Sequence, residues 1–305
     1  MLALETRKLC KDYGGRRVVD DFDMHVAEGA IYGFVGRNGA GKSTVMKMVD
    51  DLATPTSGSI HLFGEESRGR SMACGSRVGS LIESPGILEN LNAFDNLMCK
   101  ALALGIVNPK ERCRDMLRIV GLEGVGEKRA KKFSLGMKQR LGIAFALLGS
   151  PDLLLLDEPF NGLDPEGTRE LRTLVSDINR VNGVTVVISS HVLDQLDRIA
   201  TCYGVIADGR MVAELSAEQV EADCGDSLVL KADSPEQALV RLEAACPDLA
   251  LVMEPGGYLR VRGCSDAERI ALALRDANIA VIELSVVKRD IEDYFVELME
   301  GGIHV

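Results

Sequence analysis

The chain has 305 residues, 46% hydrophobic and only 4% aromatic, so it is long enough for one large or two ordinary domains with a mainly aliphatic core. Its net charge of −11 is concentrated after position 219, where 17 acidic residues stand against 8 basic ones, and neither part has the basic field of a nucleic-acid-binding protein. The N-terminus lacks a signal pattern, no apolar run approaches the ~20 residues of a membrane-spanning helix, and no CxxC pair occurs, so we expect a cytoplasmic chain whose eight cysteines are free thiols.

The first two thirds of the chain alternate predicted strands and helices, which is typical of a largely parallel sheet with helices on its faces. Apolar patterns bounded by turn residues predict strands at 3–9, 18–27, 30–35, 57–63, 152–157, 184–189, 202–207 and 210–215. Helical spacing of apolar residues predicts helices at 43–52, 91–105, 109–120, 136–149 and 165–181. The middle three of these form an inserted helical block, at about 84–150.

After a short predicted helix at 217–224 the pattern restarts. It runs in the order βαββαβ, which is the ferredoxin-like split pattern. The predicted ranges are strand 227–231, helix 235–245, strands 249–253 and 258–261, helix 266–277 and strand 280–286. A last helix is predicted at 290–300. We therefore predict two domains, 1–218 and a small α+β domain at 226–305, with the boundary near Gly225.

A glycine-rich segment follows the predicted strand 30–35 and opens the next helix. Gly36 to Ser43 fits the pattern G-x-x-x-x-G-K-S in this strand-to-helix context. Glycines let backbone N–H groups surround phosphate oxygens, and the helix N-terminus adds positive potential. Lys42 would neutralise the outer phosphates and Ser43 would offer a hydroxyl to Mg²⁺. The alternative is an incidental glycine turn, which this context disfavours.

Two further motifs end strands of the same predicted sheet. Asp157 and Glu158 follow four leucines, where open α/β sheets bind ligands, so one acid would hold Mg²⁺ and the other would accept a proton from water. The alternative is an Asp that caps the next helix. His191 ends the following strand in ISSH, within reach of a γ-phosphate, although a lone histidine is usually structural or simply exposed.

A fourth motif, FSLGMKQRL, opens the helix 136–149. Ser134 is a plausible N-cap, and Gly136 permits close backbone approach. Taken alone, this motif indicates only a capped helix.

The set GRNGAGKST, FSLGMKQRL, LLLLDEP, NGLD and SSH, in this order over residues 1 to about 218, resembles the nucleotide-binding domain of an ABC transporter. The resemblance implies a P-loop NTPase fold with an inserted helical subdomain, with ATP and Mg²⁺ as cofactors. It implies phosphate and Mg²⁺ binding by Gly36, Asn38, Gly39, Ala40, Gly41, Lys42, Ser43 and Thr44. A helix N-terminus such as that of FSLGMKQRL can then serve a phosphate held by a second copy.

The resemblance also assigns individual roles. Asp157 would bind Mg²⁺, Glu158 would be the catalytic base and His191 the switch histidine. Ser134 and Gly136 would face the γ-phosphate on a second copy, and Asp164 would couple the two sites across a dimer. Tyr13 would stack on adenine, the alternative being packing within its own hairpin.

The chain departs from the family pattern in two places. Glu83 stands where the family has a glutamine that contacts Mg²⁺ and the transmembrane partner, so it is a candidate metal ligand and catalytic residue, or else a plain surface acid. With the ending DIEDYF, it resembles the bacitracin-resistance and lantibiotic-immunity branch. The second departure is in FSLGMKQRL, which corresponds to the family's signature motif. Leu135 and Met137 stand there in place of the usual glycine and glutamine, which predicts slow hydrolysis in isolation.

The leading hypothesis is an ATPase subunit that works as a dimer on the inner face of the membrane. It would drive a separate permease that exports or expels a peptide antibiotic, and the region 83–97 is the expected permease contact. The alternatives are another export cargo (drug, sodium or lipid), a soluble ABC ATPase acting on ribosomes or DNA, and a regulatory module that holds ATP without turnover. The C-terminal domain is interpreted as a packing or dimer-bracing module.

Overall fold

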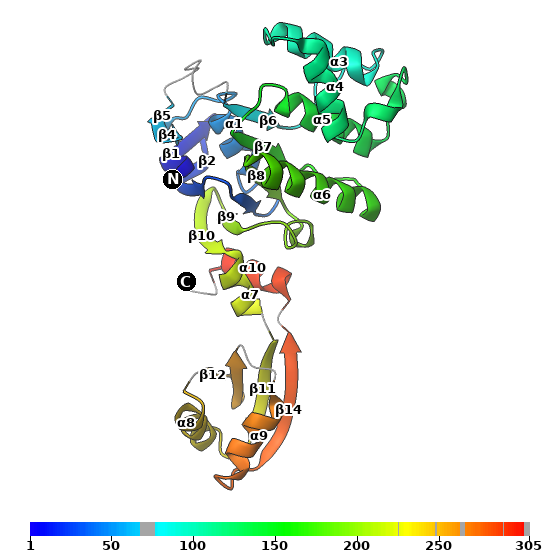
Figure 1. Ribbon diagram of the computed structural model, residues 1–305. Coiled ribbons are helices and arrows are strands. Elements are labelled where there is room, and N and C mark those ends of the chain that lie inside the picture. Colours follow the sequence, from blue (N-terminus) through cyan, green and yellow to red (C-terminus); the bar gives the residue numbers. More distant parts are fainter. Residues whose placement is uncertain (68–76, 225, 248, 263–265, 289, 302–305) are drawn as a thin grey trace. The chain divides into compact units, whose positions relative to one another are not determined.

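The computed structural model describes residues 1–67, 77–224, 226–247, 249–262, 266–288 and 290–301. The chain divides into two compact units: Met1–Leu215 with Leu298–Val305, and Ser216–Glu297. Both units combine sheets and helices, as the sequence predicts (Figure 1).

A six-stranded sheet with the order β10-β9-β3-β8-β7-β6 forms the centre of the first unit. Its strands are β3 (Ile31–Val35), β6 (Val78–Leu81), β7 (Leu153–Asp157), β8 (Thr185–Ser190), β9 (Cys202–Ala207) and β10 (Arg210–Ser216). The strands from β9 to β6 pair in parallel, and every residue of β3, β7 and β8 is buried, which explains their continuous apolar runs. Parallel pairing brings the carboxyl ends of these strands to one edge of the sheet.

The other strands of the first unit form a separate antiparallel sheet, ordered β2-β1-β4-β5. They are β1 (Leu2–Tyr13), β2 (Arg16–Ala27), β4 (Ser57–Leu62) and β5 (Glu65–Glu66). Its buried side chains share one apolar core with β3 and the first helix. The predicted strands 3–9, 18–27 and 57–63 are present, whereas β5 and β6 were not predicted.

Three helices form the inserted block, and Figure 1 shows them grouped together in the green and cyan part of the chain. They are α3 (Ala93–Ala103), α4 (Pro109–Ile119) and α5 (Leu135–Leu147), joined by the short turns η1 (Glu123–Val125) and η2 (Ala130–Lys132). The remaining elements of the first unit are α1 (Lys42–Val49), α6 (Pro165–Asn182) and η3 (Leu193–Gln195). Side chains of Asn92, Ser134 and Asp164 accept backbone N–H groups at the starts of α3, α5 and α6.

The second unit contains an antiparallel sheet ordered β12-β13-β11-β14. Its elements are α7 (Ala217–Cys224), β11 (Asp226–Ala232), α8 (Pro235–Ala245), β12 (Ala250–Glu254), β13 (Tyr258–Arg262), α9 (Ala267–Arg275) and β14 (Val281–Lys288). The last helix, α10 (Ile291–Met299), begins in this unit, and its last two residues belong to the first. Apolar residues of α8 and α9 pack on the sheet in a core of their own. The predicted βαββαβ order is present in this unit.

The structure bears on two expectations drawn from composition. Over the described ranges, no helix is both long and apolar enough to cross a membrane. The cysteines at 10, 99, 113, 202, 224 and 246 form no disulfide among the described residues, and those at 74 and 264 lie outside them.

Candidate functional site

The glycine loop lies between β3 and α1, as predicted, and its backbone needs glycine. Gly39 and Gly41 have φ angles of 83° and 114°, which side chains disfavour. A Cβ on Gly36 would lie 2.6 Å from the carbonyl oxygen of Ile206. The loop and helix start contain the eight expected phosphate-binding residues, Gly36, Asn38, Gly39, Ala40, Gly41, Lys42, Ser43 and Thr44.

Lys42, at the first turn of α1, is buried within this loop, with only 5% of its side chain exposed. Its ammonium donates to the carbonyl oxygen of Gly36 at 2.6 Å. The same nitrogen lies 3.3 Å from Oε1 of Glu158. The loop lysine and the acid after β7 are therefore neighbours, as a shared phosphate site requires.

Asp157 ends β7 and Glu158 follows it, and Ser189 of β8 forms hydrogen bonds with both residues. Ser189 donates its hydroxyl to Oδ1 of Asp157 at 2.6 Å, and the hydroxyl oxygen of Ser189 accepts the backbone N–H of Glu158 at 2.8 Å. His191 Nδ1 lies 2.7 Å from Oε2 of Glu158. Oε1 of Glu158 is buried without a hydrogen-bond partner among the described residues. Asp157, Glu158 and His191 are therefore brought together, and the role of Ser189 was not predicted, although SSH contains it.

Glu83 lies two residues beyond β6, whose last residue pairs with Leu156 beside Asp157. Its backbone has a φ of 63°, and its carboxylate forms an ion pair with Lys47 of α1. This bond raises the pKa of Lys47 above its ordinary value, with smaller contributions from Tyr13 and Asp157. The Lys47 ammonium thus faces the acidic edge of the sheet, and none of the sequence motifs predicts a role for this residue.

Tyr13 ends β1 with 48% of its surface exposed. The ammonium of Lys11 lies 4.8 Å from its ring centroid, a cation–π contact. The ring is half-exposed, and its base-binding role stays a prediction.

The oxygen donors near the glycine loop suit Mg²⁺. The candidates are the Ser43 hydroxyl and the carboxylates of Asp157 and Glu83, and oxygen is the ligand type that this hard cation prefers. Within the described ranges, no group of three His, Cys, Asp or Glu side chains is arranged to hold a metal by itself. Mg²⁺ usually binds through one or two carboxylates, waters and substrate phosphates, so this donor set fits a metal that arrives with a nucleotide.

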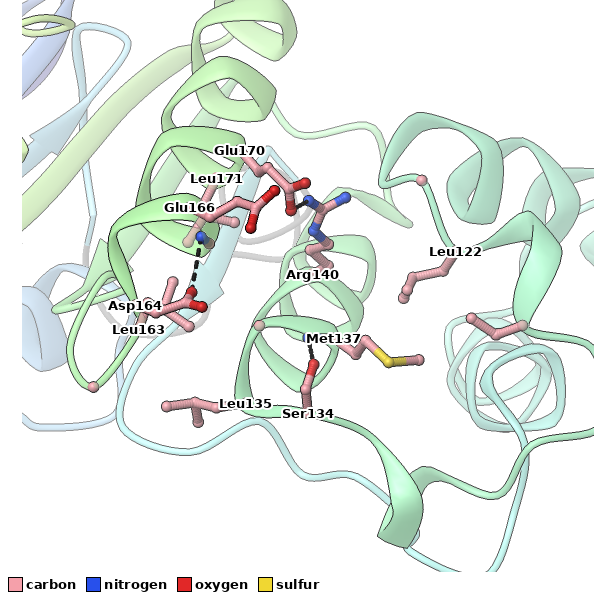
Figure 2. A pocket seen from close by; sticks show the side chains of 15 residues that line it. Leu122, Ser134, Leu135, Met137, Arg140, Leu163, Asp164, Glu166, Glu170 and Leu171 are labelled. Atoms are coloured by element: carbon pink, nitrogen blue, oxygen red, sulfur yellow. Dashed lines mark hydrogen bonds and ion pairs between the residues drawn. The ribbon is translucent and has the colours of Figure 1, made fainter.

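Ser134, Gly136 and Asp164 line a cavity of about 610 Å³ between α5 and α6 (Figure 2). Ser134 caps α5 by accepting the N–H of Met137 at 3.3 Å, and Asp164 caps α6 by accepting the N–H of Gly167 at 2.9 Å. Gly136 also lines this cavity. None of the described residues around it comes from the glycine loop, so the predicted site residues lie in two separate places.

Known proteins resemble this chain over most of its length. Residues 19–161 match the protein-family model described as ABC transporter. The bacitracin transport ATP-binding protein BcrA of Bacillus licheniformis is 37% identical over 300 residues, which are 98% of this chain and 98% of that protein. The lantibiotic transport ATP-binding protein SrtF of Streptococcus pyogenes is 41% identical over 211 residues, 69% of this chain and 90% of that protein.

A solved structure has a similar fold. The ATP-binding cassette MJ0796, in a dimeric structure of a post-hydrolysis state bound to ADP and Pi, has a TM-score of 0.63 and 20% identity over 70% of this chain and 98% of that chain. At this identity the likeness concerns the fold alone.

Proposed function

Because the chain belongs to the family of ABC transporter ATP-binding proteins, we propose that two copies of it clamp ATP between them and drive a separate membrane permease that exports or expels a peptide antibiotic. ATP is its substrate, and hydrolysis to ADP and phosphate is its reaction. The observation that carries the proposal is the division of the nucleotide machinery into two half-sites. One holds Lys42, Asp157 and Glu158, and the other holds Ser134 and Gly136.

The first half-site supports both binding and hydrolysis. The glycine loop offers backbone N–H groups and Lys42 to the phosphates. The carboxylate of Glu158 takes a proton from the attacking water, and His191 Nδ1, 2.7 Å away, holds that carboxylate in place. The Ser189 hydroxyl contacts the Asp157 carboxylate and the backbone N–H of Glu158, so one side chain ties the metal-binding acid to the backbone that carries the base.

Ser43, Asp157 and Glu83 are the residues that we propose for Mg²⁺. When bound, the metal supplies charge neutralisation at the β- and γ-phosphate oxygens. Asp157 engages Ser189 through Oδ1, which leaves Oδ2 to face the metal or its waters.

The second half-site supports a dimer. A capped helix N-terminus such as that of α5 favours anions, and here it opens on a cavity without a phosphate loop. A second copy turned by a two-fold axis would supply the missing loop, and the same contact would occur twice. Asp164, on the opposite wall of the cavity, would then face the partner subunit.

The permease and its cargo are proposed from the relatives. BcrA and SrtF are named for the transport of bacitracin and of a lantibiotic, and BcrA matches nearly the whole chain. With a permease partner, the chain would lie on the inner face of the membrane. The segment that includes Glu83 and leads into α3 is the proposed contact, because it connects the nucleotide half-site to the helical block.

We also propose that residues 226–305 form a ferredoxin-like accessory domain beside an ATPase domain at 1–218. The βαββαβ order and the strand order β12-β13-β11-β14 support this proposal. We propose a packing or dimer-bracing role for it, since a fold alone does not define an activity.

Two experiments test the proposed function. The purified Glu158→Gln variant should form a dimer when Mg-ATP is added, measured by light scattering after size exclusion, and a chain that stays monomeric at every concentration excludes the clamp. Expression together with its permease should raise resistance to bacitracin or a lantibiotic, and a Lys42→Ala version should not. Unchanged resistance with a working ATPase would indicate that the transported compound belongs to another chemical class.

A further inference from the structure

Glu83 brings a third carboxylate to an edge of the sheet that must accept a triphosphate. Asp157 and Glu158 already lie at this edge, and like charges close together destabilise one another and any bound anion. A cation beside this acid offsets part of that repulsion when no metal is present. The structure supplies one, the ammonium of Lys47.

The position and exposure of Lys47 allow its ion pair with Glu83 to be broken when another cation binds the carboxylate. It lies in the last turn of α1, the helix that starts at Lys42, so it is rigidly connected to the phosphate loop. The Lys47 and Glu83 side chains are 31% and 68% exposed, and ion pairs at such exposure are weak. The contact is therefore strong enough to orient a carboxylate and weak enough to be exchanged for a divalent cation.

We propose that Lys47 is a positioning residue that holds the Glu83 carboxylate in the metal-free protein and yields it to Mg²⁺ when the metal enters with ATP. The role rests on the Mg²⁺ site proposed above. Lys47 and the metal compete for the same carboxylate, so the metal gains the Glu83 contact at the expense of the ion pair. Lys47 therefore limits how much Mg²⁺ strengthens nucleotide binding.

The quantity to measure is the metal enhancement, the ratio of the dissociation constant for nucleotide in EDTA to that in saturating Mg²⁺. The probe is a fluorescent, non-hydrolysable ATP analogue followed by anisotropy, so that turnover does not enter the result. Lys47→Met frees Glu83 for the metal, and the enhancement should grow by about twofold to fivefold, the range expected for an exposed ion pair. In the Glu83→Gln background the same lysine change should leave the enhancement unaltered, because no carboxylate is contested.

Lys11→Met is the matched control. Lys11 is another cation close to Tyr13, and its contacts are with the Tyr13 ring and the carbonyl oxygen of Thr54, not with Glu83. Its loss should alter nucleotide affinity equally with and without metal. Thermal unfolding of each variant without ligands verifies that all of them fold.

Each outcome of these measurements either supports or overturns one of the proposed roles. An enhancement that is unchanged in Lys47→Met, or that grows equally in the Glu83→Gln background, removes the role of Lys47 and leaves the Mg²⁺ site standing. If the wild-type protein binds the analogue but shows no metal enhancement, the proposed Mg²⁺ site fails and this inference fails with it. If Lys42→Ala does not weaken binding, the proposed nucleotide site itself is wrong.

Discussion

The ammonium of Lys42 and the carboxylate of Glu158 lie 3.3 Å apart, where the glycine loop meets the end of β7. Oε1 of Glu158 has no hydrogen-bond partner among the described residues, so electrostatic attraction dominates this contact. A triphosphate entering the loop offers Lys42 several negative oxygens in place of one acid. Nucleotide binding should therefore separate Lys42 from Glu158 and leave the acid free to accept a proton.

Replacing Glu158 with Gln tests this relationship. Phosphate release should fall at least about 100-fold, because positioned general bases contribute roughly 10² to 10⁴ in rate. Nucleotide affinity should be kept or improved, since the change removes a negative charge that competes for Lys42. Phosphate release and binding of a fluorescent ATP analogue measure the two effects separately. Release within tenfold of the wild-type rate would exclude Glu158 as the base.

His191→Ala provides a graded comparison. His191 contacts Glu158 through Nδ1 and orients it without replacing it, so hydrolysis should fall by less than in Glu158→Gln. The double variant should be no slower than Glu158→Gln alone, because the histidine acts through the acid. An additive loss would indicate an independent role for His191.

Local patterns were sufficient to predict much of the site. The loop before Lys42 depends on glycines and a strand-to-helix change, and β7 is an apolar run that ends in acids, so both follow from neighbouring residues. The separate antiparallel sheet depends on which strands pair, which alternation does not specify. β6 is only four residues long and contains Gly79, so it has too little pattern to predict.

Contacts between distant segments could not be predicted either. Ser189 bonds Asp157 from a strand 32 positions away, and the Lys47–Glu83 pair joins residues 36 positions apart. Polar residues of these types are common on surfaces, so their identity alone indicates nothing. The parallel register of β7 and β8 makes Asp157 and Ser189 neighbours, whereas the packing of α1 on β7, next to β6, brings Lys47 to Glu83.

The Tyr13 ring should contribute to base binding. Tyr13→Ala should raise the dissociation constant for ATP by about 5- to 150-fold, as expected from roughly 1–3 kcal/mol of stacking. Tyr13→Phe keeps the ring and should bind normally. Competition by inorganic tripolyphosphate, which has no base, should be the same in all three proteins. Equal ATP affinity in Tyr13→Ala would return the ring to a hairpin-packing role.

Ser134→Ala should separate the capping role of this serine from its proposed contact with a partner's phosphate. Loss of the N-cap should cost about 1 kcal/mol of stability. Asp266→Ala removes the side-chain cap of α9 and should cost a similar amount. In the Glu158→Gln background, only Ser134→Ala should abolish ATP-dependent dimerisation in light scattering. Dimerisation at the same ATP concentration in both would show that Ser134 is merely a cap.

Asp50 predicts a pH effect on stability. It follows α1 and accepts a hydrogen bond from Ser80 at 2.7 Å, and burial raises its pKa above the ordinary 3.8. The folded state therefore binds more protons than the unfolded chain just above pH 3.8, and stability falls as pH rises through the native pKa. Asp50→Asn removes this loss, so its melting temperature relative to wild type should increase from acidic to neutral pH. Asp12, whose pKa Arg17 lowers, should give the opposite sign when changed to Asn. A constant difference between Asp50→Asn and wild type across this range would mean that Asp50 titrates alike in the folded and unfolded chain.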